Sequence, residues 1–213
     1  MSTSEGRTVY PPSDDTWLLE DSLRVADLRG KRVAEIGFGS GYVTSLLSER
    51  ADEVIATDLS EEAALHARRS LGSKAEGVHL IVTPELSCIR SGVRLDLIVS
   101  NPPYLPDEGL WDLSIEGGPT GIETCIRVIE ESRRFECDSV VVVSSLSDLP
   151  GMYRYLESIG HRASVISKRH LFFEELMVLL ISPGSSDSGP KDLEGFCDTP
   201  VLRAQPERED QVR

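Results

Sequence analysis

The chain has 213 residues, 39% of them hydrophobic, which suffices for one packed domain with a tail but is short for two ordinary domains. Its 36 acidic and 22 basic residues give a formal net charge of −14, so repulsion by phosphates argues against direct nucleic-acid binding. No apolar run reaches the roughly 18 residues of a membrane-spanning helix, and the first residues lack a signal-peptide pattern, so we expect a soluble cytoplasmic protein with no membrane partner.

Short runs rich in Val, Ile and Leu alternate along the chain with segments of helical periodicity. The expected strands are residues 32–37, 53–58, 78–82, 95–100 and 139–146. The expected helices between them are residues 42–50, 61–71 and 121–135. Continuous apolar strands that alternate with amphipathic helices indicate an α/β fold in which helices cover both faces of a parallel sheet.

Residues 162–182 have a different pattern, because two β-type runs are joined there by a short polar link. Such a link leaves no room for a crossover helix, so the two runs should pair antiparallel. The sequence therefore predicts a doubly wound sheet of seven strands, mainly parallel, with a C-terminal antiparallel hairpin.

The two ends of the chain differ in composition from its middle. Residues 183–213 are rich in Ser, Gly, Pro and charge, and such a composition cannot bury enough apolar surface to offset the entropy of ordering. We expect a flexible N-terminus over residues 1–7, one folded domain over residues 8–182 and a disordered acidic tail over residues 183–213.

The stretch PPSDDTWLL near the N-terminus has the pattern of a helix start. Ser13 or Asp14 can serve as the N-cap, and we expect Trp17, Leu18 and Leu19 to pack inward.

Three glycines, Gly37, Gly39 and Gly41, lie between the first expected strand and the helix that follows it. Glycines allow a tight turn and let a ligand approach the backbone N–H groups of the helix N-terminus. Glu35 would repel a pyrophosphate but attract a cation, and Asp58 at the end of the next strand is placed for two ribose hydroxyls. These acids favour S-adenosylmethionine, which carries an ammonium and a sulfonium but no phosphate, over NAD. The alternative is a glycine turn kept only for close packing.

The third expected strand is followed by TPELSC. Thr83 or Glu85 could contact an adenine there. A simple turn is the alternative, since Pro84 alone explains why the strand stops.

The fourth expected strand ends in Asn101, Pro102, Pro103 and Tyr104. The prolines fix the backbone, so that the Asn101 side-chain oxygen and the Pro102 carbonyl form a rigid pair of acceptors for the two hydrogens of a planar NH₂ group. The ring of Tyr104 can stack on that plane. The arrangement suits methyl transfer to an amide or aryl amine by orientation alone. The alternative is an Asx-type turn that ends the strand.

The motifs EIGFGSG, ATDLS and SNPPYLP, in this order, resemble the HemK-related class I methyltransferases, which methylate glutamine in release factors. The segment VYPPSDDTWLLEDSL is similar to the short archaeal and eukaryotic branch, as are EGGPTGIE and HLFFEELMVLLIS. The resemblance implies a Rossmann-like fold, S-adenosylmethionine as cofactor and transfer of a methyl group to the glutamine of the Gly-Gly-Gln loop of a class 1 release factor.

The resemblance also implies roles for particular residues. At the acceptor it implies Asn101, Pro102 and Tyr104. At the cofactor it implies Thr16, Glu35, Gly37, Gly39, Gly41, Asp58, Leu59, Glu85 and Asn101. Because the N-terminal segment lies over the cofactor in this branch, Tyr10, Asp15 and Thr16 are candidates for closing the site. The chain departs from the family in having Asp14 where Glu is common and in lacking the usual acid after the third strand.

The family typically works with a small zinc-binding activator protein that adds a strand to the sheet, and residues 77–82 are the candidate edge here. The alternative is an edge shielded by the chain's own tail. Two other activities are alternatives. The exocyclic amine of adenine fits the same acceptors, but the acidity of the chain disfavours N6-adenine methylation. Lysine methylation needs a neutral amine and often an aromatic cage.

Overall fold

The computed structural model describes residues 10–107 and 117–184. The N-terminal segment 1–7 and residues 185–213 of the expected tail lie outside the described residues. Within the described ranges, no helix is both long and apolar enough to cross a membrane.

The centre of the molecule is a seven-stranded sheet with the order β3-β2-β1-β4-β5-β7-β6. The strands are β1 Arg32–Ile36, β2 Glu53–Asp58, β3 Val78–Val82, β4 Leu97–Ser100, β5 Asp138–Ser144, β6 His161–His170 and β7 Glu175–Pro183. The first five pair parallel, and β7 pairs antiparallel with both β5 and β6. The predicted fold class, including the terminal hairpin, is confirmed.

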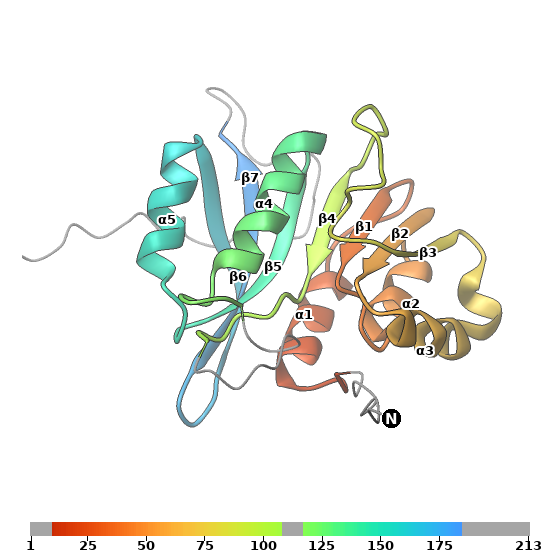
Figure 1. Cartoon of the computed structure of the whole chain (residues 1–213), viewed down its shortest axis with the longest axis horizontal. Helices are drawn as coiled ribbons and strands as arrows, with labels where there is room; N and C mark the ends of the chain where they lie inside the picture. The colour runs from red at the N-terminus through yellow and green to blue at the C-terminus, as the bar shows by residue number, and fades with distance from the viewer. Residues whose placement is uncertain (1–9, 108–116, 185–213) are drawn as a thin grey trace, which may run out of the picture.

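Helices cover both faces of the sheet (Figure 1). The helices are α1 Asp14–Arg24, α2 Tyr42–Ser48, α3 Glu61–Leu71, α4 Glu123–Phe135 and α5 Leu149–Ser158, with a 3₁₀ turn at Gly72–Ala75. Apolar side chains of α1, α2 and α3 pack on one face and those of α4 and α5 on the other, which gives two hydrophobic cores separated by the sheet.

Helix α5 was absent from the sequence prediction. Its N-cap is Asp148, whose carboxylate accepts a hydrogen bond from the Gly151 N–H at 2.9 Å. Pro150 occupies the first turn, where the missing N–H costs nothing. Proline and glycine are common in loops, but here Pro150 and Gly151 lie in the first turn of a helix.

The expectation that Trp17 packs inward is wrong. The side chain of Trp17 is 44% exposed, whereas Leu18 and Leu19 are buried as expected. The buried stripe of α1 continues through Ser22 and Leu23, and a helix turns by about 100° per residue, so Trp17 lies outside the stripe.

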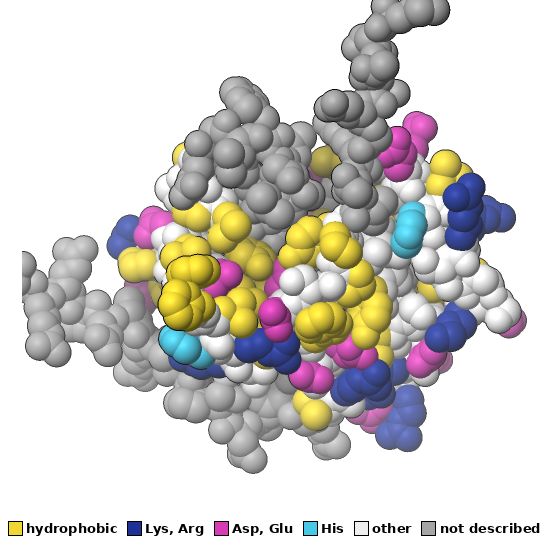
Figure 2. Space-filling view, turned by 90° about the horizontal axis from the view of Figure 1, so that it is seen from below, with side chains coloured by type: hydrophobic (Ala, Val, Ile, Leu, Met, Phe, Trp, Pro, Cys, Tyr) yellow, Lys and Arg dark blue, Asp and Glu magenta, His cyan; other side chains and the backbone are white. Residues whose placement is uncertain are grey.

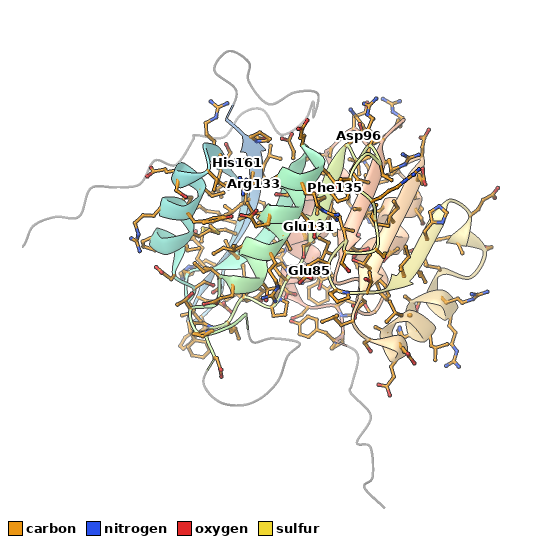
Figure 3. All side chains as sticks on the ribbon, turned by 45° about the horizontal axis from the view of Figure 1, so that its top comes forward. Glu85, Asp96, Glu131, Arg133, Phe135 and His161 are labelled. Carbon is orange, nitrogen blue, oxygen red and sulfur yellow. The ribbon has the colours of Figure 1, made fainter. Side chains whose placement is uncertain are left out.

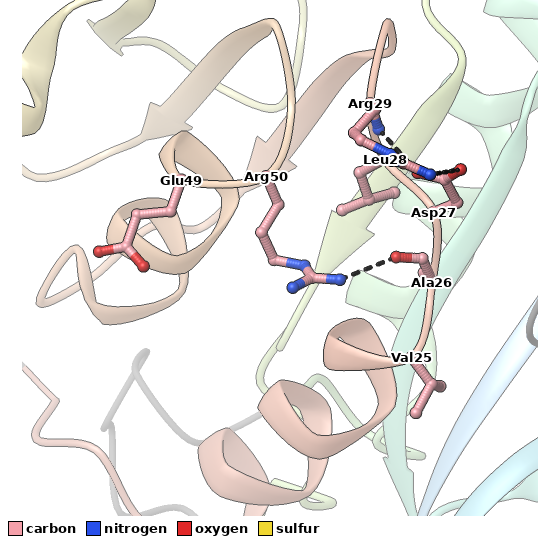
Figure 4. Close-up of a pocket in the computed structure, with 7 residues that line it drawn as sticks. All are labelled: Val25, Ala26, Asp27, Leu28, Arg29, Glu49 and Arg50. Carbon is pink, nitrogen blue, oxygen red and sulfur yellow. Dashed lines mark hydrogen bonds and ion pairs between the residues drawn. The ribbon is translucent and has the colours of Figure 1, made fainter.

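A pocket of about 410 Å³ adjoins the starts of β1 and β2, lined by residues 25–29, Glu49 and Arg50 (Figure 4). One guanidinium nitrogen of Arg50 donates to the carbonyl oxygens of Arg24 and Ala26, at 2.8 and 2.9 Å. Arg50 thereby satisfies acceptors that the end of α1 leaves open. This pocket lies at the amino edge of the parallel strands, opposite the residues predicted to act on a ligand.

Candidate active site

Strands β1 and β4 are neighbours in the sheet, although the chain passes through β2 and β3 between them. In open α/β sheets, ligands bind beyond the carboxyl ends of the strands at such a switch point. The two strand ends are joined there by a hydrogen bond from the Ser100 hydroxyl to the Ile36 carbonyl oxygen, at 2.8 Å. The glycine turn follows β1 and Asn101 follows β4, so the fold brings the two predicted halves of the site together.

The three glycines of the turn after β1 have different surroundings. All three have positive φ, a conformation that L side chains rarely adopt. A Cβ on Gly41 would lie 2.7 Å from the Ala67 Cβ, so Gly41 allows α2 to pack closely on α3. A Cβ on Gly37 or Gly39 would meet no atom within 4 Å. Close packing therefore explains Gly41 alone, and the open side of the turn lies at Gly37 and Gly39.

Asp58 ends β2 beside this turn. Its carboxylate accepts hydrogen bonds from the backbone N–H groups of Gly39 and Ser60, both at 2.9 Å. Each bond goes to a different carboxylate oxygen, so each oxygen keeps capacity for a further donor such as a ribose hydroxyl. The next residue, Leu59, is 69% exposed and offers an apolar surface at the same edge.

Glu35 lies within β1 and is only 3% exposed. The Thr44 hydroxyl, in the first turns of α2, donates to its carboxyl group at 2.5 Å. Burial raises the pKa of the Glu35 carboxyl to about 8; the Thr44 hydrogen bond opposes this and the charge of Asp58 adds to it. The predicted partner of a cationic ligand is thus a buried acid between β1 and α2, largely protonated at neutral pH.

The residues after β3 are engaged with other parts of the chain. Glu85, labelled in Figure 3, has a φ of 40°. Its carboxylate forms an ion pair with Arg127 on α4 at 2.8 Å. The hydroxyls of Thr83 and Ser87 are 2.9 Å apart. Contact of Glu85 or Thr83 with an adenine stays a prediction.

Asn101 carries the most informative side chain of the acceptor motif. Its Oδ1 atom is buried and has no hydrogen-bond partner among the described residues. A buried acceptor without a donor costs about 1–3 kcal/mol, and such groups call for an explanation in function. Pro102, which follows, is buried and holds the backbone of the motif in place.

A second glycine-rich segment supports this motif from outside. A Cβ on Gly117 would lie 2.5 Å from the Pro103 carbonyl oxygen, and one on Gly121 would lie 2.4 Å from the Tyr104 carbonyl oxygen. The Gly117 N–H donates to the Leu105 carbonyl oxygen at 2.8 Å, and the Ser147 hydroxyl donates to that of Tyr104 at 2.6 Å. The acceptor loop is therefore fixed by backbone contacts that only glycines permit.

Asp15 joins the N-terminal segment to the acceptor motif. Its buried carboxylate accepts hydrogen bonds at 3.2 Å from the phenol groups of both Tyr10 and Tyr104. Burial, with the charge of Asp15, raises the pKa of Tyr10 to about 12 and also raises the pKa of Tyr104. Both phenols therefore stay protonated donors. The link fixes the hydroxyl end of the Tyr104 ring, and stacking of that ring on an NH₂ group stays a prediction.

Thr16, the candidate for closing the site, is 6% exposed, and its backbone N–H and hydroxyl both donate to Asp15, at 2.6 and 3.2 Å.

Glu174 was not singled out from the sequence. Its carboxylate accepts a hydrogen bond from Ser144 at 2.5 Å, and its charge contributes to the raised pKa values of Tyr10 and Tyr104. The two adjacent acids in HLFFEEL are the sequence feature that could have pointed to Glu174.

Comparisons with known proteins show which proteins this chain is similar to. Residues 14–112 match the methyltransferase small domain. The chain is 33% identical over 139 residues to the Mus musculus protein named Methyltransferase HEMK2, across 57% of this chain and 63% of that protein. It is 29% identical over 139 residues to the Escherichia coli K12 protein named Release factor glutamine methyltransferase, across 59% of this chain and 50% of that protein.

The chain is similar to methyltransferases, and its match to the methyltransferase small domain covers residues 14–112. Its matches span between half and two thirds of the length of these curated relatives. Its fold also matches a solved structure of the E. cuniculi Mtq2-Trm112 complex, described as responsible for methylation of the eRF1 translation termination factor, with a TM-score of 0.69 and 26% identity over 82% of this chain and 98% of that one. In this chain, the glycine turn and the acceptor motif occupy one edge of the sheet.

Proposed function

We propose that this chain transfers a methyl group from S-adenosylmethionine to the side-chain amide nitrogen of the glutamine in the Gly-Gly-Gln loop of a class 1 release factor. The names of the mouse and E. coli relatives support this proposal, as does the similarity to the Mtq2-Trm112 complex.

One observation carries the proposal: the buried Oδ1 atom of Asn101 lacks a donor within the described chain. A primary amide supplies that donor, since its NH₂ group has two hydrogens for the two acceptors of the motif, the Asn101 side-chain oxygen and the Pro102 carbonyl. The rigid loop holds both acceptors in place before a substrate arrives, and such prior orientation lowers the barrier to transfer.

The cofactor end fits S-adenosylmethionine on two observations. Asp58 keeps acceptor capacity for ribose hydroxyls beside the open glycines, and Leu59 gives an exposed apolar surface next to it. When bound, the cofactor supplies an electrophilic methyl group. The chain itself orients the acceptor amide through Asn101 and Pro102, and Tyr104, tied to Asp15, covers that amide from the solvent.

We further propose that a small zinc-binding activator protein pairs with β3. Strand β3 is an edge of the sheet, and its last residue, Val82, is 44% exposed. A groove of about 1130 Å³ with partly apolar walls runs beside it, lined in part by Leu65 and Ile81. An added strand would satisfy the free edge and cover this groove.

Methyl transfer from radiolabelled S-adenosylmethionine tests the proposal. The acceptors are the class 1 release factor of the same organism, its variant with Ala in place of the loop glutamine, and duplex DNA, each offered with and without the co-expressed partner. We expect label in the release factor that disappears with the loop glutamine. Label on DNA alone would instead identify an adenine methyltransferase.

A further inference from the structure

The turn of the terminal hairpin exposes two aromatic side chains. Phe172 is 91% exposed and Phe173 is 83% exposed, and their rings pack edge to face with centroids 4.8 Å apart. Aromatic side chains are enriched in protein interfaces, and nothing in the folding of the domain requires these two to face solvent. We propose that this pair, here called the Phe172–Phe173 tip, is the docking surface for the protein that carries the acceptor glutamine; this inference rests on the proposed function.

The position of the tip favours a substrate over another partner. Strand β7 runs antiparallel to β5, and its start pairs with the end of β5, with Ser144 opposite Leu176. The tip therefore lies at the same edge of the sheet as Asn101 and the glycine turn. Figure 1 shows the β6–β7 turn on the same side of the molecule as the start of α1.

Hydrogen bonds join the tip to the acceptor loop. The Leu171 N–H donates to the Glu174 carbonyl oxygen at 2.8 Å and closes the turn. The Glu174 carboxylate accepts from Ser144 at 2.5 Å, and three residues further on Ser147 donates to the Tyr104 carbonyl oxygen at 2.6 Å. A protein bound at the tip would thus be held at a fixed place relative to the acceptor site.

The charge around the tip identifies the chemistry of its partner. The nearby bases Lys168 and Arg169 are already ion-paired, Lys168 with Glu175 and Arg169 with Asp14 and Asp21. The acids that flank the tip or pair with these bases are Asp14, Asp21, Glu174 and Glu175, four acids against Lys168, Arg169 and the exposed His170. Figure 2 shows hydrophobic side chains gathered on this face, with acidic and basic side chains among and beside them.

Phosphate-rich partners would be repelled by this surplus of acids, as by the net charge of −14. The surface instead fits a polypeptide that presents apolar and basic side chains around its acceptor glutamine. Binding remote from the reacting amide would then select the whole substrate protein over an isolated glutamine loop.

The test is a double variant, Phe172→Ser with Phe173→Ser, in the full chain. Both side chains are outside the core, so the variant should fold. We expect KM for the intact release factor to rise about 30-fold, as for the loss of an interface hot spot, with kcat unchanged. Methylation of a short Gly-Gly-Gln peptide and the Kd of S-adenosylhomocysteine should stay within about twofold. Val25→Ser, which removes a 62% exposed apolar side chain at the opposite edge, is the matched control and should change nothing.

An unchanged KM for the release factor would overturn the docking proposal. An equal loss of peptide methylation in the double variant would also overturn it, because the tip would then only support the structure of the site. A wild-type dimer that dissociates in the double variant would also overturn it, because the tip would then bind a second copy. If the wild-type chain methylates neither protein nor peptide, the proposed function fails. Direct binding of the release factor then decides the docking proposal: binding that the double variant loses supports it, and no binding by wild type overturns it.

Discussion

At the scale of single residues, the proposed role of Asn101 predicts opposite effects of one substitution on stability and on activity. Its buried oxygen lacks a donor within the described chain. Asn101→Ala removes this oxygen, so we expect the melting temperature to stay the same or rise, because an unsatisfied buried acceptor is lost. Methyl transfer should fall by about 10²–10³-fold or more, as for other positioned hydrogen-bonding groups. Calorimetry with S-adenosylhomocysteine is the control: a collapse of its affinity would assign Asn101 to the cofactor rather than to the acceptor.

Glu35 should make cofactor binding depend on pH. Burial raises its pKa to about 8, so at pH 6 to 7 the free protein holds a proton there. A bound cation favours the carboxylate, so binding releases this proton and the affinity rises with pH, by at most about tenfold per unit, up to the raised pKa. The ligand's own amino group also titrates near pH 8, so the Kd should be measured between pH 5.5 and about 7.5. Glu35→Gln should flatten the dependence of Kd on pH. Equal slopes in wild type and Glu35→Gln would show that the protonation of Glu35 does not change when the ligand binds.

The Glu35 carboxyl should also make the free energy of unfolding depend on pH, in the opposite direction to the cofactor affinity. The folded chain keeps a proton that the unfolded chain loses near the ordinary value of 4.5, so folding binds a proton between about pH 4.5 and 8. The wild-type free energy of unfolding should therefore fall, relative to that of Glu35→Gln, as the pH rises through this window.

At the scale of elements, a substitution in the glycine segment around Gly121 should displace the acceptor loop and leave the cofactor end of the site unchanged. A Cβ at Gly121 would lie 2.4 Å from the Tyr104 carbonyl oxygen, so Gly121→Ala must displace the loop. A displacement of this size can lower the rate by about 100-fold. S-adenosylhomocysteine affinity should stay within a few-fold, because the glycine turn is on another strand.

The matched control is Gly30→Ala. Gly30 has a φ of 72°, close to the 76° of Gly121, but a Cβ there meets nothing within 4 Å. Both variants carry the same backbone strain, and only Gly121→Ala carries the clash. Equal activity in the two variants would refute the role of loop contact.

The sequence predicted those elements whose signal is local. Buried parallel strands are continuous apolar runs, and the glycine turn and the Asn-Pro-Pro-Tyr motif are contiguous, so each was visible in a short window. Helix α5 was missed because Pro150 and Gly151 resemble a loop, and Trp17 was misplaced because the face of a short helix is decided by its neighbours. The bond between Asp15 and Tyr104 joins residues 89 positions apart, which no local pattern encodes.

At the scale of the whole molecule, the sheet has one edge at β3 and the other at β6, and the site lies between them at the carboxyl ends. The terminal hairpin covers β5 with β7 and carries the Phe172–Phe173 tip to the site. The β3 edge is remote from that tip, because five strands separate β3 from β6 in the sheet order. Substrate and activator can thus occupy separate surfaces of one small domain.

The direction of the backbone groups in β3 allows a test of the activator surface. The Thr83 N–H donates inward to the Asp58 carbonyl oxygen at 2.9 Å. Alternate residues of a strand point to opposite sides, so the Val82 N–H faces away from the sheet and is available to an added strand. Val82→Pro removes this donor and places a ring at the edge, a position where proline is tolerated within a sheet.

We expect Val82→Pro to reduce co-purification of the zinc-binding partner by about tenfold or more, whereas Val82→Thr, which keeps the N–H and the branched shape, should retain it. The two variants should have similar melting temperatures without the partner, because Val82 is 44% exposed and its N–H points away from the neighbouring strand. Partner retained by Val82→Pro would place the activator on another surface. Partner lost by both variants would show that the Val82 side chain, rather than the added strand, provides the contact.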